Sequence, residues 1–237
     1  MLPPVRQLFP IPVDEVDAAE VYRADERKGE PWLLVNMITS VDGAISIDGR
    51  SGGLGSPADK DVFHVLRGLA DTILVGAGTA RAENYGPPKV AARLAIVSGS
   101  LRIEPDARVF SGDVKPIVFT TTDTDPARRS ALEAVAEVIP VGTGTVDLRA
   151  ALAHLRGVVV CEGGPTLNGQ LVAAGLVDEL CLSVAPLLVS GASERMAHGD
   201  PPAVPVSLQL ARVLEADGLL LLRYVNAASV PSPSSTG

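Results

Sequence analysis

The chain has 237 residues, of which 46% are hydrophobic and 20% are charged, so it is long and apolar enough to bury a core without disulfides or metal ions. Only 3% of the residues are aromatic, and we therefore expect a core of Val, Leu, Ala and Ile. The formal net charge of −8 argues against nucleic acid as a partner, because a nucleic-acid-binding face has to be basic.

The cysteines, the histidines and the distribution of apolar residues exclude further classes of protein. Cys161 and Cys181 stand in apolar runs, which favours two buried free thiols over a disulfide. The three histidines have no Cys or His at ligand spacing, so we expect no metal site. No apolar run approaches the roughly 18 residues that span a bilayer, and the N-terminus lacks the pattern of a signal peptide. We expect a cytoplasmic protein with no membrane partner.

The first 55 residues contain one helix, one strand and a glycine-rich loop. A short helix is predicted over 14–23, with Asp14 as its cap. Residues 32–38 form an apolar run typical of a central strand. Asp42 and the glycine after it fit a plain turn and a functional site about equally well. The segment 48–56 is the most glycine-rich of the chain, as in a mobile loop or a cradle for a ligand.

A helix with a clear start follows. Ser56 is a good N-cap, and the proline after it suits the first helical position. His64 and Arg67 lie three residues apart and share a side of this helix, near the margin of its apolar face. A solvated His64 is expected, whereas Arg67, near the glycine-rich loop, is a candidate for holding an anion.

Residues 72–75 predict a short strand that leads into a glycine turn and a helix over 76–83. The pattern matches a dinucleotide-binding fingerprint only in part, because Arg81 replaces the third glycine and no acidic residue follows at the Rossmann spacing. A standard Rossmann unit is therefore disfavoured. The helix start at Gly78 and Thr79 is still suited to binding a phosphate.

Strands and helices continue to alternate through residue 175, which is typical of a sheet with helices on its faces. Strands are predicted over 93–98, 115–121 and 178–189, and helices over 126–135, 146–155 and 166–174. Residues 207–215 and 219–225 flank an Asp-Gly turn, which predicts an antiparallel hairpin at the sheet edge. We expect one domain over 31–225, an N-terminal arm over 1–30 and a flexible tail over 226–237.

The most informative stretch runs from Val158 to Leu167. An apolar strand pattern ends in Glu162, and Gly163, Gly164 and Pro165 then open a helix. Glycines permit close backbone approach, and the N–H groups at a helix start attract anions, so a phosphate-bearing ligand is indicated. An ordinary strand-to-helix turn is at least as good an explanation of the glycines and proline alone. The carboxylate at the end of a buried strand favours a site.

Four motifs in this order resemble the riboflavin-biosynthesis pyrimidine reductase family over roughly residues 32–224. They are Asn36-Met37-Ile38-Thr39-Ser40-Val41-Asp42-Gly43, the helix bearing Arg67, the stretch Ile73–Glu83, and Glu162-Gly163-Gly164-Pro165-Thr166-Leu167 with Gly175–Leu180 and Ala185–Leu188 downstream. The resemblance implies an α/β, dihydrofolate-reductase-like fold: a mixed sheet of about eight or nine strands flanked by helices, with the C-terminal hairpin. It also implies a homodimer and NADPH-dependent reduction of a ribosylamino-pyrimidine phosphate to the ribitylamino product.

The resemblance also implies roles for individual residues. Glu162 and Arg67 match substrate-binding positions, Arg67 toward the phosphate. The cofactor-binding positions are Thr39, which meets the cofactor amide, with Thr79, Glu83, Ser98, Gly163, Gly164, Pro165, Thr166 and Leu167. Glu162 is a candidate catalytic residue, and Asp42 is the one candidate acid near the reacting centre.

The sequence departs from the family at two places. Gly53-Leu54-Gly55-Ser56 stands where many relatives carry an aromatic contact to the cofactor, and Val90 stands where a second phosphate-binding Arg is usual, a loss for which Lys89 or Arg93 is a candidate substitute. The zinc deaminase half that is often fused to this reductase is absent from the sequence. These departures leave two alternatives: an NADPH-dependent reductase of another heterocycle such as dihydrofolate, and an NADPH-binding protein without catalysis.

Overall fold

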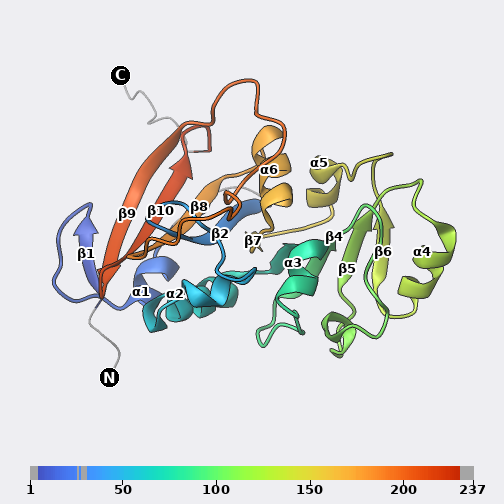
Figure 1. Cartoon of the computed structure of the whole chain (residues 1–237), viewed down its shortest axis with the longest axis horizontal. Helices are drawn as coiled ribbons and strands as arrows, with labels where there is room; N and C mark the ends of the chain where they lie inside the picture. The colour runs from blue at the N-terminus through green and yellow to red at the C-terminus, as the bar shows by residue number, and fades with distance from the viewer. Residues whose placement is uncertain (1–4, 26, 28–30, 230–237) are drawn as a thin grey trace, which may run out of the picture.

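The computed structural model describes residues 5–25, 27 and 31–229, which form a ten-stranded sheet flanked by helices (Figure 1). The strands are β1 (Arg6–Phe9), β2 (Trp32–Ser40), β3 (Thr72–Gly76), β4 (Arg93–Val97), β5 (Ile117–Thr120), β6 (Glu137–Pro140), β7 (Val158–Cys161), β8 (Glu179–Ala185), β9 (Leu208–Ala216) and β10 (Leu219–Asn226). The helices are α1 (Ala18–Arg23), α2 (Pro57–Leu69), α3 (Ala77–Ala82), α4 (Pro126–Glu133), α5 (Leu148–Leu152) and α6 (Pro165–Ala173), with short 3₁₀ turns η1 (Ser51–Gly53) and η2 (Arg108–Phe110).

The sheet order is β1-β9-β10-β8-β2-β7-β3-β4-β5-β6, as Figure 1 shows from one side of the molecule to the other. The seven strands from β8 to β6 in this order run parallel to one another. The β9–β10 hairpin joins β8 through antiparallel pairing, and β1 closes the far edge on β9. The expected mixed sheet with a C-terminal hairpin is therefore present.

The structure corrects the expected sheet in two respects. It has ten strands rather than eight or nine, because β1 and β6 were not predicted; both have only four residues, and none of these is fully buried. The hairpin also does not form the sheet edge, because β1 from the N-terminal arm covers β9. The turn itself is as predicted, with Asp217 and Gly218 both at positive φ, as a tight two-residue hairpin turn requires.

The predicted cap of α1 is wrong. This helix begins at Ala18, and the Asp17 carboxylate accepts hydrogen bonds from the N–H groups of Ala19 at 2.7 Å and Glu20 at 3.3 Å. Asp14 lies one turn too early to cap it. The cap of α2 is as predicted, because the Ser56 hydroxyl accepts from the Asp59 N–H at 3.2 Å.

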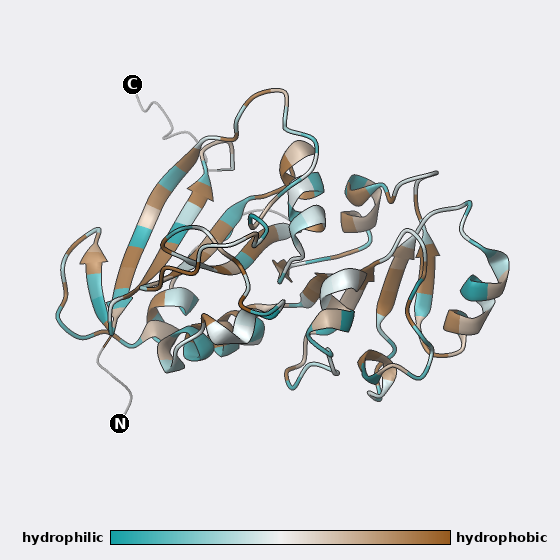
Figure 2. Cartoon of the chain, viewed as in Figure 1, coloured by the Kyte–Doolittle hydropathy of each residue, from teal (hydrophilic) through white to brown (hydrophobic). Residues whose placement is uncertain are grey.

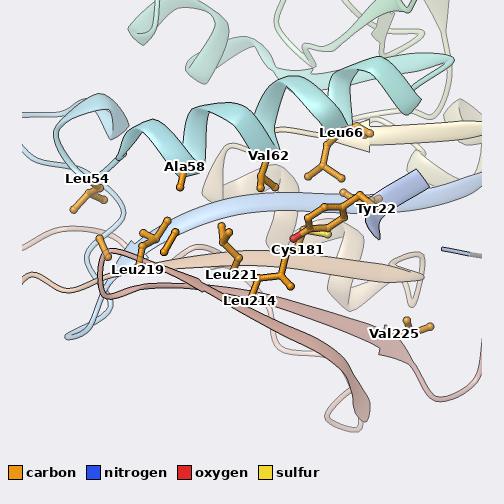
Figure 3. Packing of buried hydrophobic residues seen from close by; sticks show 14 of the residues in the cluster. Tyr22, Leu54, Ala58, Val62, Leu66, Cys181, Leu214, Leu219, Leu221 and Val225 are labelled. Atoms are coloured by element: carbon orange, nitrogen blue, oxygen red, sulfur yellow. The ribbon is translucent and has the colours of Figure 1, made fainter. Parts of the chain in front are cut away.

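Aliphatic side chains fill both sides of the sheet, and Figure 2 shows the central strands mostly brown between helices of mixed colour. On one face α1 and α2 pack over β2, β8, β9 and β10, and α3 and α4 pack over β3, β4 and β5. Figure 3 shows the first of these clusters, where Val62 and Leu66 of α2 point toward Leu221 of the hairpin. The opposite face carries α5 and α6, with Leu167 and Leu171. The central strands are buried on both faces, as the sequence of β2 predicted.

A buried ion-pair cluster attaches the N-terminal arm to the sheet. Glu179, whose side chain is 0% exposed, accepts from Arg223 Nε at 2.8 Å, Arg27 Nη2 at 3.0 Å and Trp32 Nε1 at 2.9 Å. Burial by itself raises the pKa of the Glu179 carboxyl, but Arg223 and Arg27 bring it below its usual value overall. Asp25 of the arm adds a bidentate pair with Arg212 on β9. The domain boundaries expected at residues 30 and 225 stay a prediction, and residues 230–237 of the expected tail lie outside the described part.

In the part of the chain that the structure describes, none of the helices is both long and apolar enough to cross a bilayer. The two cysteines are buried and unpaired, as predicted.

Candidate active site

A cavity of about 780 Å³ opens at the carboxyl ends of β2, β7, β3 and β4. Its wall includes Ile38, Glu162, Gly76 and Val97, which stand within two residues of the ends of those four strands. Because these strands are parallel, their carboxyl ends lie along one edge of the sheet, where open α/β sheets bind ligands. The prediction that Glu162 follows a buried strand is confirmed, since β7 ends at Cys161.

Glu162 is held by two side chains from other elements. Arg67 of α2 donates from Nε to Glu162 Oε1 and from Nη2 to Glu162 Oε2, both at 2.7 Å, and the Tyr85 hydroxyl donates to Oε2 at 2.7 Å. The Glu162 side chain is 3% exposed and that of Arg67 is 21% exposed. The Arg67 guanidinium also lies 4.2 Å from the ring centre of Phe63. We call Arg67, Tyr85 and Glu162 the carboxylate clamp.

The protonation states in the clamp follow from burial and charge. Burial, and next the Glu162 carboxylate, raise the pKa of the Tyr85 hydroxyl well above its usual value. The phenol therefore keeps its proton and donates it in a hydrogen bond. Burial lowers the pKa of Arg67, but the bonds to Glu162 more than offset this and raise it. The clamp thus joins a cation, a neutral phenol and a carboxylate, and it fixes where the carboxylate oxygens lie.

The loop after Glu162 packs on the loop after β3. The Gly163 carbonyl accepts from the Gly76 N–H at 2.8 Å, and Gly163 has φ +88°, which favours glycine. A Cβ on Gly164 would lie against the Thr79 hydroxyl, far inside van der Waals contact. The sequence predicted close backbone approach here, and the close neighbour is the β3–α3 segment.

The start of α6 faces the cavity without a side-chain cap. Gly164 is the N-cap and has no side chain to cap the helix, so within the described part of the chain the first N–H groups have no side-chain cap. Pro165, Thr166 and Leu167 all line the cavity, as do Thr79 and Ser98. This nine-residue helix therefore presents positive N–H dipoles to any ligand in the cavity.

Glu83 also lines the cavity, but its carboxylate is already engaged. Glu83 Oε1 accepts from the Ser51 N–H at 2.9 Å and from the Ser51 hydroxyl at 3.1 Å. These bonds tie the glycine-rich loop to the end of α3. They give Glu83 a structural task beside the nucleotide contact that the resemblance implied.

The structure does not place Thr39 and Asp42 in the cavity wall. Thr39 is 8% exposed on β2, and its neighbour Ile38 lines the cavity instead. The Asp42 carboxylate accepts from the Ser40 hydroxyl and from the N–H groups of Val189 and Ser190. These bonds, with that of Ser40 the strongest influence, lower the pKa of Asp42 to about 2. The carboxylate is thus engaged outside the cavity wall, which does not favour the expected role of Asp42 as a catalytic acid, and that role stays a prediction.

The two suggested substitutes for the missing phosphate-binding Arg also lie elsewhere. Arg93 begins β4, at the opposite end of that strand from the cavity, and pairs with Glu137 at 2.6 Å. Lys89 is exposed and is not part of the cavity wall. Neither position supports the suggested role.

Sequence reasoning missed several cavity residues. Lys60 and Phe63 stand on the same side of α2 as Arg67, and their i, i+3, i+7 spacing was a usable signal. Tyr85 gave no such signal, because it is 77 residues from Glu162 in the sequence and only the folded structure brings its hydroxyl to that carboxylate. Glu194 comes from the loop after β8 and also lines the cavity. Among the described residues, no group of three or more His, Cys, Asp or Glu side chains is arranged to hold a metal ion.

The chain is similar in sequence to a family of reductases. The RibD C-terminal domain family profile matches residues 31–221. The 2,5-diamino-6-ribosylamino-4(3H)-pyrimidinone 5′-phosphate reductase of Methanothermobacter thermautotrophicus is 29% identical over 211 residues, which cover 82% of this chain and 97% of that protein. The riboflavin biosynthesis protein RibD of Mycobacterium tuberculosis is 30% identical over 178 residues, which cover 70% of this chain but 45% of that protein.

Solved structures show the same architecture. A pyrimidine reductase-like protein from Corynebacterium diphtheriae superimposes with a TM-score of 0.74 at 28% identity, over 85% of this chain and 93% of that one. Dihydrofolate reductase from Enterococcus faecalis superimposes with a TM-score of 0.51 at 12% identity, over 83% of this chain and 96% of that one. The expected dihydrofolate-reductase-like fold is confirmed.

Proposed function

Since this chain belongs to the RibD C-terminal domain family, we propose that it uses NADPH to reduce a ribosylamino-pyrimidine phosphate to the ribitylamino product in riboflavin biosynthesis. The observation that carries the proposal is that Glu162 and the start of α6 line one cavity. An anionic cofactor at the helix start and a polar substrate at the carboxylate then lie close enough to react.

The residues at the helix start fit the cofactor. The uncapped N–H groups of α6, the Thr79 hydroxyl and the backbone at Gly164 suit a pyrophosphate, which needs donors and room for close approach. Ser98, directly after β4, also lines the cavity and in this proposal lies beside the adenosine. When bound, NADPH supplies the hydride for C1′ of the sugar.

The carboxylate clamp has the substrate task in this proposal. Glu162 accepts hydrogen bonds from N–H or hydroxyl groups of the ribosylamino-pyrimidine, and Arg67 and Tyr85 keep its oxygens in place. Reduction of the open-chain imine requires a hydride at C1′ and a proton at the imine nitrogen, which solvent supplies. The chain contributes orientation rather than a strong acid, in keeping with the engaged state of Asp42.

The test is NADPH oxidation, followed by absorbance, with the ribosylamino-pyrimidine phosphate or with dihydrofolate. We expect turnover with the pyrimidine and none with dihydrofolate. Turnover with dihydrofolate alone would refute the substrate, and NADPH binding without turnover on either compound would support a non-catalytic protein. The likeness to dihydrofolate reductase is at 12% identity and concerns the fold alone.

We also propose that the protein acts as a homodimer through the sheet edge formed by β1 and by residues 208–212 of β9, which β1 does not cover. Large apolar side chains are exposed there, including Phe9, Ile11 (70% exposed), Leu208 and Leu210. An apolar strand edge of this kind favours pairing with another chain. Light scattering after size exclusion measures the mass, and a monomer at micromolar concentration would contradict the proposal.

A further inference from the structure

The three glutamates and Arg81 in the cavity wall already have partners. Glu162 is held by Arg67, Glu83 by Ser51, and Glu194 pairs with His198 at 2.9 Å. The cations of the wall are Lys60 and Arg81. Arg81 donates from Nη1 to the Arg102 carbonyl at 2.7 Å.

The Lys60 side chain, unlike that of Arg81, is not held by a neighbouring group among the described residues. Among the described residues, its ammonium takes part in none of the hydrogen bonds or ion pairs found in the structure; only its backbone N–H is bonded, to the Ser56 carbonyl. Its side chain is exposed and lines the cavity. Asp59 on the same helix also lines the cavity, and burial raises the pKa of its carboxyl, with the Ser183 hydroxyl and Lys60 acting in the opposite direction. Lys60 is therefore a cation available to a ligand.

The position of Lys60 on α2 relates it to the carboxylate clamp. Lys60, Phe63 and Arg67 are spaced i, i+3 and i+7, so they lie along one side of the helix. Seven residues at 1.5 Å each separate Lys60 from Arg67 by about 10 Å along the axis. Arg67 lies near the C-terminal end of α2, where it contacts Glu162. Lys60 lies near the N-terminal end of α2, and Phe63 lines the cavity between the two. A pyrimidine carrying a ribose and a terminal phosphate is an elongated molecule of comparable length.

Arg67 is poorly suited to bind that phosphate itself. Its Nε and Nη2 both donate to Glu162, and the attached charges neutralise each other. Taking the guanidinium away from Glu162 would leave a buried carboxylate with only the Tyr85 bond, which is costly. Arg67 therefore acts as a positioning residue for Glu162.

We propose that Lys60 binds the terminal phosphate of the substrate and so sets its preference for a phosphorylated sugar. This assignment rests on the proposed function for the identity of the substrate. With the pyrimidine and C1′ at Glu162, the sugar chain runs along α2 past Phe63, and the phosphate reaches the Lys60 ammonium. An ammonium is a compact cation that binds phosphate as a point charge.

The test compares Lys60→Met with the parent and with Lys89→Met, a matched control whose lysine is exposed outside the cavity wall. Calorimetry measures the binding of ribose 5-phosphate and of ribose, without NADPH or turnover. We expect the parent and Lys89→Met to prefer ribose 5-phosphate, and Lys60→Met to bind it roughly 10- to 100-fold more weakly, as for a lost charge-assisted bond, with ribose binding unchanged. Lys60→Arg should retain most of the preference.

Two results would overturn the assignment: ribose 5-phosphate binding by Lys60→Met at the parent's affinity, or a parent that does not distinguish ribose 5-phosphate from ribose. Both can be observed whether or not the parent turns over a pyrimidine, so failure of the proposed function appears separately, in the NADPH oxidation assay. Where turnover is measured, Lys60→Met should raise KM for the phosphorylated substrate and leave the Kd for NADPH as in the parent.

Discussion

Replacement of Glu162 by Gln tests the carboxylate clamp most directly. The change keeps the size of the side chain but removes the negative charge that Arg67 and Tyr85 face at 2.7 Å. The amide oxygen of the new side chain can still accept a hydrogen bond. Its NH₂ group, however, replaces a second acceptor and faces the donors of Arg67 or Tyr85. We expect a less stable protein that also loses pyrimidine reduction.

The expected loss of stability follows from the burial of the two partners. Removing one member of a fully buried ion pair costs about 3 to 5 kcal/mol. The Arg67 side chain is 21% exposed and is partly solvated, so we discount the cost to about 2 kcal/mol. For a chain of this length, about 2 kcal/mol lowers Tm by roughly 4 to 8 °C. Glu137→Gln is the matched control, because Glu137 pairs with Arg93 at 2.6 Å with side chains 51% and 35% exposed, and such surface pairs contribute about 0 to 1 kcal/mol.

The assay measures Tm of both variants by calorimetry, together with the Kd for NADPH and kcat/KM for the pyrimidine substrate. If Glu162 contacts the substrate, kcat/KM should fall about 10- to 100-fold, the value of one charge-assisted hydrogen bond, while the Kd for NADPH stays within about twofold. Equal melting of Glu162→Gln and Glu137→Gln would refute the energetic reasoning. Unchanged kcat/KM, or NADPH binding that weakens in parallel, would refute the substrate role.

Three further outcomes are expected. Gly164→Ala should weaken NADPH binding about tenfold, a loss of about 1.4 kcal/mol, because its Cβ displaces the Thr79 hydroxyl; Gly68→Ala, whose Cβ meets nothing within 4 Å, should bind as the parent does. Asp42 has a folded-state pKa of about 2 against 3.8, so its contribution to stability is present above pH 3.8 and is lost as the pH falls toward 2. The Tm difference between parent and Asp42→Asn should therefore shrink over that range, and a constant difference would contradict the pKa. Burial raises the pKa of Cys161 to about 12, so neither it nor the similarly buried Cys181 should react with iodoacetamide until the protein is unfolded in urea; labelling of the native protein, read by mass spectrometry, would show that the thiols are accessible.

Local sequence determined much of this protein. The apolar run of β2, the Ser56 cap of α2 and the Asp217-Gly218 turn act through neighbouring residues, and each predicted element is present. The position of Glu162 at the end of a buried strand follows from the same local pattern. Short elements such as β1 and β6 escaped prediction, because pairing with another strand stabilises them, β9 for β1 and β5 for β6, and not a pattern within their own four residues.

Tertiary structure decided what the side chains of the site do. The Glu162-Gly163-Gly164-Pro165 stretch indicates an anion site with a nearby acid, but Arg67 and Tyr85 reach that acid from 95 and 77 residues away. Asp42 resembles a catalytic acid in sequence, yet the Ser40 hydroxyl and N–H groups 147 and 148 residues away engage its carboxylate and lower its pKa to about 2. Hydrogen bonds and charge pairs act over a few ångströms and depend on direction, so sequence can place such groups on elements, but only the packing of those elements determines their partners.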